Sequence, residues 1–292
     1  MKSVLVFRTH KFDARTALEL RRLQTAGLVV VVAADERFET LDTLEFPKAS
    51  LTEDSLNRLG LASHPNVGWL CGDYALYLAA ELVPDADQYW SIDRDVRINF
   101  ERPADFFSAF ADLELDFLGV RHEMAPPNWY WLSRMEPHRA RVYQTLFGTL
   151  RVSRRAVTHL LRERRALSGV PSHLYPNDES FVASVLANDG FTCGVFRDRQ
   201  DYFPYRSFAL RRVVSGTMLD EAGRDNLVHH AVLYGEEFAE KAVGASRRPL
   251  SSIGARELVE GMRAEFGRER SAEFAARLVA GWPEHAGVTS LA

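Results

Sequence analysis

Two short runs near the start of the chain constrain its fold more than any other feature. Residues 4–7 and residues 28–34 are apolar throughout, with no alternation of apolar and polar side chains. A strand with one face in water alternates, whereas a strand of a parallel sheet is covered on both faces and is apolar continuously. The sequence therefore predicts an α/β fold with a parallel sheet between layers of helices.

The segment between the two runs predicts a helix that completes a βαβ unit. Asp13 is a good N-cap, Leu20 and Leu23 have helical spacing, and Gly27 ends the helix before the second run. Ligands of open α/β sheets bind beyond the carboxyl ends of the strands. Polar side chains that directly follow a predicted strand are therefore the first candidates for a site.

Composition excludes several classes of protein. The 292 residues, 46% of them hydrophobic, suffice for one large α/β domain or two small ones. Because 36 Lys and Arg face 40 Asp and Glu, the formal net charge is −4, and we expect no nucleic-acid partner. The longest apolar runs are too short for a signal-peptide core or a membrane span, so any membrane contact is expected to be peripheral.

The cysteines bear on the compartment. The two cysteines, Cys71 and Cys193, provide neither a disulfide framework nor a four-ligand zinc site. Such a pattern is typical of proteins in a reducing cytoplasm, which is where we expect this one.

Further predicted elements follow the opening unit. We expect strands at residues 88–92, 116–120, 148–152 and 191–196, helices at residues 72–83, 103–113, 153–167 and 177–188, and a charged helical tail from about residue 250. The predicted organisation is one domain over residues 1–245, with halves at 1–100 and 101–245, and a C-terminal helical extension over residues 246–292.

The triplet Asp93-Arg94-Asp95 directly follows the predicted strand 88–92. Two carboxylates one residue apart offer the hard oxygen ligands that Mg²⁺ and Mn²⁺ prefer, provided that the chain turns between them. In a straight strand the two side chains would point to opposite faces. The alternative is a solvated turn. The position at a strand end favours a divalent-metal site on Asp93 and Asp95.

The chain resembles GT-A-type glycosyltransferases over roughly residues 3–235, and the resemblance is carried by GDYALY at residues 72–77 and YWSIDRDV at residues 89–96. It implies a Rossmann-type open mixed sheet flanked by helices, with a C-terminal helical appendage. It also implies a metal-dependent hexosyltransferase that moves a sugar from a UDP- or GDP-sugar to a saccharide or glycoconjugate acceptor. Mn²⁺ or Mg²⁺ on Asp93 and Asp95 would bridge the donor diphosphate, and the expected setting is bacterial surface polysaccharide synthesis.

The same resemblance assigns the nucleotide to the ends of the first two strands. Arg8, Thr9 and His10 end the first strand region, and Asp35 follows the second apolar run. Asp35 would accept a hydrogen bond from the base or ribose, or it is a solvated loop acid. Arg8 and His10 are either phosphate contacts or structural polar groups. Asp73 either reaches the ribose or caps the helix that begins beside it.

Asp178 and Glu179, at the start of a predicted helix, resemble the acidic motif that supplies the base in several inverting GT-A enzymes. An inverting transferase needs a carboxylate to accept the proton of the acceptor hydroxyl. Acids in a first helical turn also complement the helix dipole without any catalytic role. We expect inversion with one of the two as the base, and the choice between them stays open; a retaining mechanism would not need this base.

Two further groups are candidates by resemblance. His230 is the expected third metal ligand, and because His229 and His230 would face opposite ways on a strand, at most one coordinates. Structural histidines are the alternative. Trp129, Tyr130 and Trp131 are expected to bind the acceptor, since aromatic rings stack on the apolar faces of sugars, with core packing as the alternative.

Six arginines lie close together in the second half of the chain: Arg151, Arg154, Arg155, Arg162, Arg164 and Arg165. The interpretation we favour is a solvated helix face balanced by acids elsewhere. The alternative is a surface for phosphate or an anionic acceptor.

Motifs of several other enzyme classes are missing. The chain contains no phosphate-loop motif, no dinucleotide-binding glycine motif, no His-Glu-x-x-His and no Gly-x-Ser-x-Gly. Two competing functions remain: a non-catalytic carbohydrate- or nucleotide-binding protein of the same fold, and a metal-dependent phosphohydrolase. Against the second, no further acidic cluster lies near Asp93 in the sequence.

Overall fold

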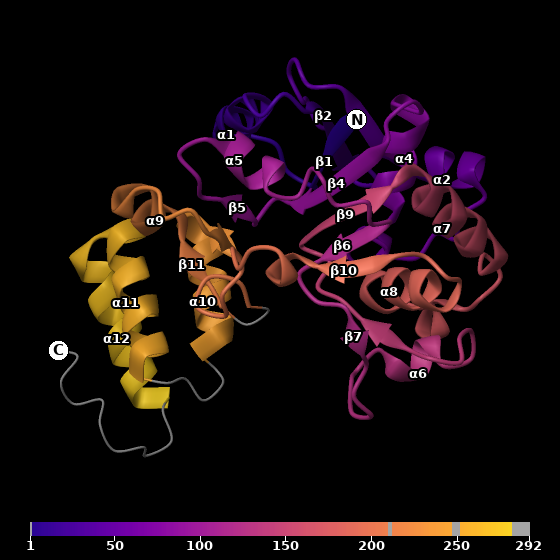
Figure 1. Ribbon diagram of the computed structural model, residues 1–292. Helices are drawn as coiled ribbons and strands as arrows, with labels where there is room; N and C mark the ends of the chain where they lie inside the picture. Colours follow the sequence, from indigo (N-terminus) through magenta and orange to yellow (C-terminus); the bar gives the residue numbers. More distant parts are fainter. Residues whose placement is uncertain (1, 210–211, 247–251, 282–292) are drawn as a thin grey trace. The chain divides into compact units, whose positions relative to one another are not determined.

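The structure is a computed structural model that describes residues 2–209, 212–246 and 252–281 (Figure 1). Contacts within the chain divide it into two compact units. Unit 1 comprises Met1–Arg94 and Arg102–Asp201, and unit 2 comprises Asp95–Glu101 and Tyr202–Ala292. The boundaries expected from the sequence, at residues 100 and 245, stay predictions.

Unit 1 is built on an open seven-stranded sheet with the order β10-β6-β9-β4-β1-β2-β3. Its strands are β1 (Ser3–Thr9), β2 (Val29–Asp35), β3 (Lys48–Leu51), β4 (Gln88–Asp93), β6 (Phe117–Gly119), β9 (Thr149–Ser153) and β10 (Cys193–Val195). Every neighbouring pair is parallel except the two that involve β9, which is antiparallel to β4 and β6. The predicted open mixed α/β sheet is confirmed.

Helices flank this sheet in unit 1 (Figure 1). They are α1 (Ala14–Gln24), α2 (Glu53–Leu59), α3 (Val67–Leu70), α4 (Tyr74–Leu82), α5 (Pro103–Ser108), α6 (Leu132–Met135), α7 (Arg154–Ala166) and α8 (Asp178–Asn188), and a small hairpin joins β7 (Glu123–Met124) to β8 (Tyr143–Gln144). Asp13, Ser153 and Asn177 accept the capping hydrogen bonds of α1, α7 and α8, so the predicted N-cap Asp13 is confirmed.

Alternate residues of the central strands pack on opposite faces. Val4, Val6 and Tyr89 belong to the core that also contains the buried residues of α4 and α8. Trp90, the next residue of β4, lies instead against Phe106, with ring centroids 5.6 Å apart. Because side chains alternate along a strand, Arg8 follows Val4 and Val6 onto the α4 face.

Arg151 and Arg164 correct the expectation of a solvated arginine face, because their exposed fractions are 1% and 0%. Arg151 donates to the backbone oxygens of Phe110 (2.6 Å) and Leu113 (2.7 Å). The predicted helix over residues 103–113 is shorter in the structure, because α5 ends at Ser108. Beyond that end, the backbone oxygens of Phe110 and Leu113 accept from the Arg151 guanidinium. A buried arginine needs such partners, and the partners lie far away in the sequence.

The described residues of unit 2 form two short strand pairs and four helices. The pairs are β5 (Arg97–Ile98) with β12 (Val228–His229) and β11 (Val214–Ser215) with β13 (Val232–Leu233); the helices are α9 (Gly216–Ala222), α10 (Gly235–Ser246), α11 (Ser252–Phe266) and α12 (Arg268–Gly281). One apolar cluster contains Phe238, Met262 and Phe274, and so joins α10, α11 and α12. None of the helices in the described ranges has the length and apolarity needed to cross a membrane.

Glu265 of α11 caps the amino ends of two other helices of unit 2. One carboxylate oxygen accepts from the Ser215 hydroxyl (2.6 Å) and the Thr217 N–H (3.1 Å) at α9, and the other accepts from the Gly235 N–H (2.9 Å) at α10. Burial raises the pKa of Glu265, but these hydrogen bonds outweigh it and hold the pKa below its usual value. The carboxylate thus joins three helices in its ionised form.

We predict that Glu265→Ala lowers the free energy of unfolding by about 1–2 kcal/mol at pH 7, because two helix ends lose their cap. Since the folded pKa is lowered, this contribution is present above the unfolded-state pKa and disappears as the pH falls through the folded one. Chemical denaturation at pH 7 and pH 4 measures the loss of unfolding free energy and its dependence on pH. Glu260→Ala on the same helix, which removes an exposed pair with Arg256, is the control, and an equal loss there would contradict the capping role.

Candidate functional site

Three strands of unit 1 end side by side at the edge where the predicted donor site lies. β1 is parallel to β2 and to β4, so their carboxyl ends, at Thr9, Asp35 and Asp93, share that edge. The register pairs Arg8 with Asp93. Paired residues of parallel strands point to the same face, so the sheet itself brings this arginine beside this carboxylate.

Arg8 is a partly buried cation among carboxylates. Its guanidinium lies 3.0 Å from a carboxylate oxygen of Asp93 and 4.0 Å from one of Asp178, and the Phe147 ring centroid is 5.1 Å away. The side chain of Arg8 is only 14% exposed. Two acids separated by 85 residues therefore meet at one guanidinium, although the sequence offers no sign of that encounter.

Two glycines make room for these side chains. A Cβ on Gly72 would lie 2.1 Å from the Arg8 guanidinium, and a Cβ on Gly68 would lie 2.0 Å from the Asp35 carboxylate. Both distances are far below contact, so a larger residue at either position would displace the charged group. Neither glycine was predicted as part of the site, because the close approach is visible only in three dimensions.

Asp178 is a buried acid held by backbone donors. One carboxylate oxygen accepts from the Gly72 N–H (2.9 Å) and the other from the Glu179 N–H (2.7 Å). With an exposed fraction of 4%, burial raises the pKa of Asp178 to about 7, although Arg8 opposes the rise. The bond to the Glu179 N–H lies at the start of α8, so the helix-end role expected as the alternative is present as well.

Glu179 lies next to it and keeps part of its surface exposed. Burial raises the pKa of Glu179 to about 7, opposed by a hydrogen bond from the Phe147 backbone and by the charge of Arg121. The charge of Asp93 raises it further. A partly exposed carboxyl with a pKa near neutrality has the proton affinity that a general base needs.

Asp73 has buried protein partners. Its carboxylate is 0% exposed, accepts twice from Arg164 at 2.8 Å, and also accepts from the Tyr77 hydroxyl (2.6 Å). The side chain makes no capping hydrogen bond to α4. We therefore propose neither of the roles expected from the sequence, ribose contact or helix cap, for this residue.

Thr9 and His10 end β1 differently. Thr9 is buried, and its hydroxyl exchanges hydrogen bonds with the backbone of Lys11, which closes the turn after the strand. His10 follows in an exposed position. Of the three residues predicted there, Arg8 is the one that lies among the acids.

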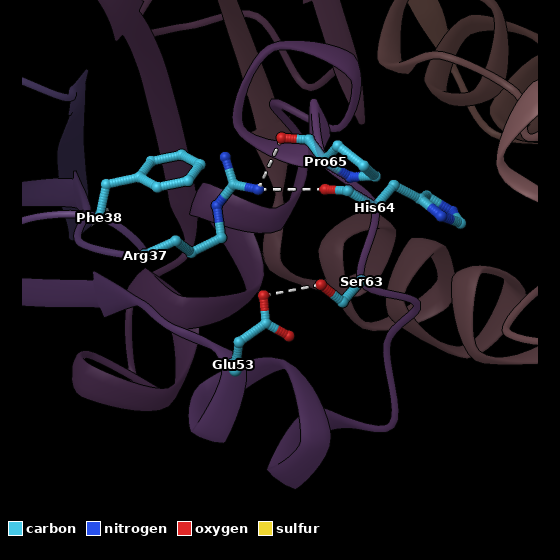
Figure 2. A pocket seen from close by; sticks show the side chains of 6 residues that line it. All are labelled: Arg37, Phe38, Glu53, Ser63, His64 and Pro65. Atoms are coloured by element: carbon cyan, nitrogen blue, oxygen red, sulfur yellow. Dashed lines mark hydrogen bonds between the residues drawn. The ribbon is translucent and has the colours of Figure 1, made fainter.

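An open pocket of about 310 Å³ is lined by Arg37, Phe38, Glu53, Ser63, His64 and Pro65 (Figure 2). Arg37 donates to both oxygens of Asp35 at 2.8 Å, and also to the backbone oxygens of His64 and Pro65. Figure 2 shows the ring of Phe38 facing this guanidinium. The pocket therefore combines an exposed ring, a fixed cation and the Glu53 carboxylate beside the end of β2.

The aromatic segment is split between core and surface. Trp131 is 8% exposed, as the core alternative predicts, whereas Tyr130 is 72% exposed and meets the Trp131 ring edge-on at 4.5 Å. Trp129 packs against the core. The structure adds Trp69 of α3, which is 69% exposed with its ring 5.6 Å from that of Trp131. In the sequence, the one indication that Trp69 belongs to the site is its position between Gly68 and Gly72.

In unit 2, the two adjacent histidines have different partners. His230 Nε2 lies 3.6 Å from a carboxylate oxygen of Asp95, while His229 Nε2 lies 2.9 Å from Asp225. The Nδ1 atom of His230 is buried without a hydrogen-bond partner among the described residues. A carboxylate oxygen and an imidazole nitrogen at this separation suit a shared divalent cation, so Asp95 and His230 fit the expected type of ligand.

A separate group of ligand-type side chains in unit 1 is already neutralised. Within the described ranges, His159, Glu163 and Asp189 lie within 4.8 Å of one another. The Arg139 guanidinium lies 2.7 Å from Glu163 and 3.0 Å from Asp189, so both carboxylates already form ion pairs with an arginine. We assign no metal to this group.

Comparisons with known proteins give distant structural similarities. No protein-family model matches the chain, and no curated protein matches it. It is similar to the crystal structure of a glycosyltransferase involved in glycosylation of the major capsid of PBCV-1, with 14% identity and a TM-score of 0.43 over 85% of this chain and 100% of that chain. It is also similar to core-mannan synthase A (CmsA/Ktr4) from Aspergillus fumigatus in an Mn/GDP form, with 9% identity and a TM-score of 0.40 over 68% of this chain and 73% of that one. Similarities this distant leave the functional assignment to the residues themselves.

We predict that the raised pKa of Asp178 makes the protein less stable as the pH rises from about 4 to about 7, because the unfolded chain releases this proton in that range whereas the buried carboxyl of the folded protein keeps it. Asp178→Asn keeps an oxygen acceptor for the Gly72 N–H and removes the titration. Between pH 5 and pH 8 the wild type should therefore lose about 1–3 kcal/mol of unfolding free energy relative to this variant.

Asp116→Asn is the matched control for denaturation at the two pH values. Asp116 is also buried, but hydrogen bonds from Arg155 and Thr192 outweigh burial and lower its pKa. Its ionised form stabilises the fold above the unfolded-state pKa, so Asp116→Asn should be less stable than the wild type at pH 8. Parallel pH profiles of wild type and Asp178→Asn would refute the raised pKa.

Proposed function

We propose that the protein is a metal-dependent glycosyltransferase that uses a UDP- or GDP-sugar donor and a saccharide acceptor. The observation that carries the proposal is the meeting of Arg8 with Asp93 and Asp178 at the carboxyl edge of the sheet, with Glu179 next to Asp178. A cation can bind the donor diphosphate, and a carboxyl with a pKa of about 7 can accept the proton of the acceptor hydroxyl.

Glu179 is the base that we favour for an inverting reaction. Both oxygens of Asp178 accept hydrogen bonds from backbone N–H groups, and its side chain is 6% exposed. Glu179 is the more accessible of the two. It would take the proton of the acceptor hydroxyl while that oxygen attacks the anomeric carbon, and Asp178 would hold the start of α8 in place.

Arg8 is the proposed partner of the donor phosphates, and the pocket beside Asp35 is the proposed place of the nucleoside. A guanidinium can form paired hydrogen bonds with phosphate oxygens, and Phe38 offers an exposed ring on which a base can stack. His10 stays a proposed contact beside Arg8. This arrangement supports nucleotide binding in unit 1.

Asp93 and Asp95 stay the proposed ligands of Mn²⁺ or Mg²⁺, because they lie two residues apart along the chain. His230 is proposed as a third ligand on its 3.6 Å approach to Asp95. A bound ion would offset the negative charge that builds on the leaving diphosphate. In unit 1, Arg8 would offset part of the same charge through its own contact with phosphate.

The exposed rings of Tyr130 and Trp69 are the proposed contacts for the acceptor, with Trp129 and Trp131 supporting them. Sugar rings present C–H groups that pack on aromatic faces. The proposed setting is the cytoplasm, in the assembly of a bacterial surface polysaccharide or glycoconjugate. The free state of Cys71 and Cys193 supports that compartment.

The direct test is donor consumption by the purified protein. We expect one member of a panel of UDP- and GDP-sugars to be consumed with Mn²⁺, faster when a saccharide acceptor is added, and consumption to stop with EDTA. Donor consumption at the same rate with and without each acceptor would favour the phosphohydrolase. Binding of a donor without its consumption would favour the non-catalytic protein. Asp95→Asn should remove the response to Mn²⁺ and is measured beside the wild type.

We predict that Glu179→Gln lowers the transfer rate by about 10²–10⁴-fold and leaves the donor dissociation constant nearly unchanged, because the amide cannot accept the hydroxyl proton. The wild-type rate should fall below about pH 7 as Glu179 becomes protonated. Single-turnover kinetics and donor titration separate the two effects. The control is Glu163→Gln, an acid paired with Arg139 outside the site, and a Glu179→Gln enzyme as fast as this control would exclude the base role.

A further inference from the structure

The ion pair between Arg8 and Asp93 has a consequence for how ligands bind. The register of β1 with β4 places the two residues side by side, and their charged atoms are 3.0 Å apart. The pair is therefore a property of the folded sheet. Under the proposed function, each partner also has a ligand of its own: Arg8 the donor diphosphate, and Asp93 the divalent cation.

The surroundings keep the guanidinium at this position. Gly72 leaves the space it occupies, the Phe147 ring lies 5.1 Å away, and the backbone oxygen of Gly68 accepts from the guanidinium at 3.4 Å. The second carboxylate, on Asp178, lies 4.0 Å from Nη1, the guanidinium nitrogen that approaches Asp93. A cation approaching Asp93 thus meets a positive charge that the fold holds there and that is only 14% exposed to screening water.

We infer that Arg8 couples metal binding to nucleotide binding by competing with the metal ion for Asp93. Without nucleotide, the guanidinium neutralises Asp93 and repels a divalent cation. When the phosphates of a nucleoside diphosphate engage Arg8, Asp93 is released to the ion. Coupling between two ligands is reciprocal, so the ion strengthens nucleotide binding by the same factor. The inference rests on the proposed function for the identity of the two ligands.

The test is the affinity for Mn²⁺, measured by calorimetry and by the electron paramagnetic resonance signal of the free ion, with and without GDP or UDP. For the wild type we expect Mn²⁺ to bind about 5–150-fold more tightly when the nucleotide is present. For Arg8→Gln we expect Mn²⁺ alone to bind at least about fivefold more tightly than to the wild type, and the coupling factor to fall towards one. If the loss of the Arg8 charge strengthens Mn²⁺ binding only when nucleotide is absent, then Arg8 and the metal ion compete for Asp93.

Two further variants separate this mechanism from a general change of charge. Gly72→Ala keeps the charge of Arg8 but displaces its guanidinium, and should also tighten the binding of Mn²⁺ alone. In an Asp93→Asn background, Arg8→Gln should leave Mn²⁺ affinity unchanged, because the contested carboxylate is gone. Arg155→Gln, which removes an arginine paired with Asp116 elsewhere in unit 1, is the control for net charge and should not change Mn²⁺ affinity. Circular dichroism and the melting temperature establish that each variant is folded.

The outcomes separate the inference from the proposed function. Mn²⁺ binding that requires Asp93 but is unchanged or weakened by Arg8→Gln would overturn the inference and leave the metal site standing. Mn²⁺ binding unaffected by Asp93→Asn would remove Asp93 from the metal site, and both would fall. Equal tightening by Arg8→Gln and Arg155→Gln would reduce the effect to net charge and would also overturn the competition.

Discussion

A guanidinium without contact with water lies among three segments of unit 1. Arg164 of α7 donates to both oxygens of Asp73, at the start of α4, and to the backbone oxygen of Pro176, just before α8. Burying this pair carries a large desolvation cost, which the hydrogen bonds and the Phe181 ring 3.7 Å away offset. Gly72 precedes Asp73, and Asn177 lies between Pro176 and Asp178. Arg164 therefore fixes both segments of the chain that the Gly72–Asp178 hydrogen bond joins.

The charge balance of the site follows from that arrangement. One guanidinium, Arg8, lies near Asp93 and Asp178, and Glu179 is close enough for Asp93 to raise its pKa. Burial disfavours the charged forms of the two helix-start carboxyls more than Arg8 and Arg121 favour them, so both carboxyls have pKa values of about 7. Near neutral pH the site therefore holds protons that it can exchange with a ligand, and this property supports both base catalysis and sensitivity to a new cation.

Close packing explains which residues define the site without carrying its chemistry. Gly68 and Gly72 contribute no functional group, yet a Cβ on either would occupy the position of a charged atom. Trp69 lies between them, largely exposed, beside Trp131. The short helix α3, which spans only Val67–Leu70, thus contacts the Asp35 carboxylate at the end of β2 and the Arg8 guanidinium of β1. It also carries the exposed ring of Trp69.

The sequence by itself determined the sheet and the edge where the acids gather. Continuous apolar runs such as residues 28–34 fit only strands covered on both faces, and acids that directly follow a strand must lie at its carboxyl end, so local pattern was sufficient. Only the tertiary structure decided that Arg164 and Arg151 are buried, that Asp73 belongs to an internal ion pair, and that Arg8 meets Asp178. The physical reason is that burial, pKa and ion pairing depend on neighbours brought together from distant parts of the chain, and residue type and spacing do not encode which neighbour arrives.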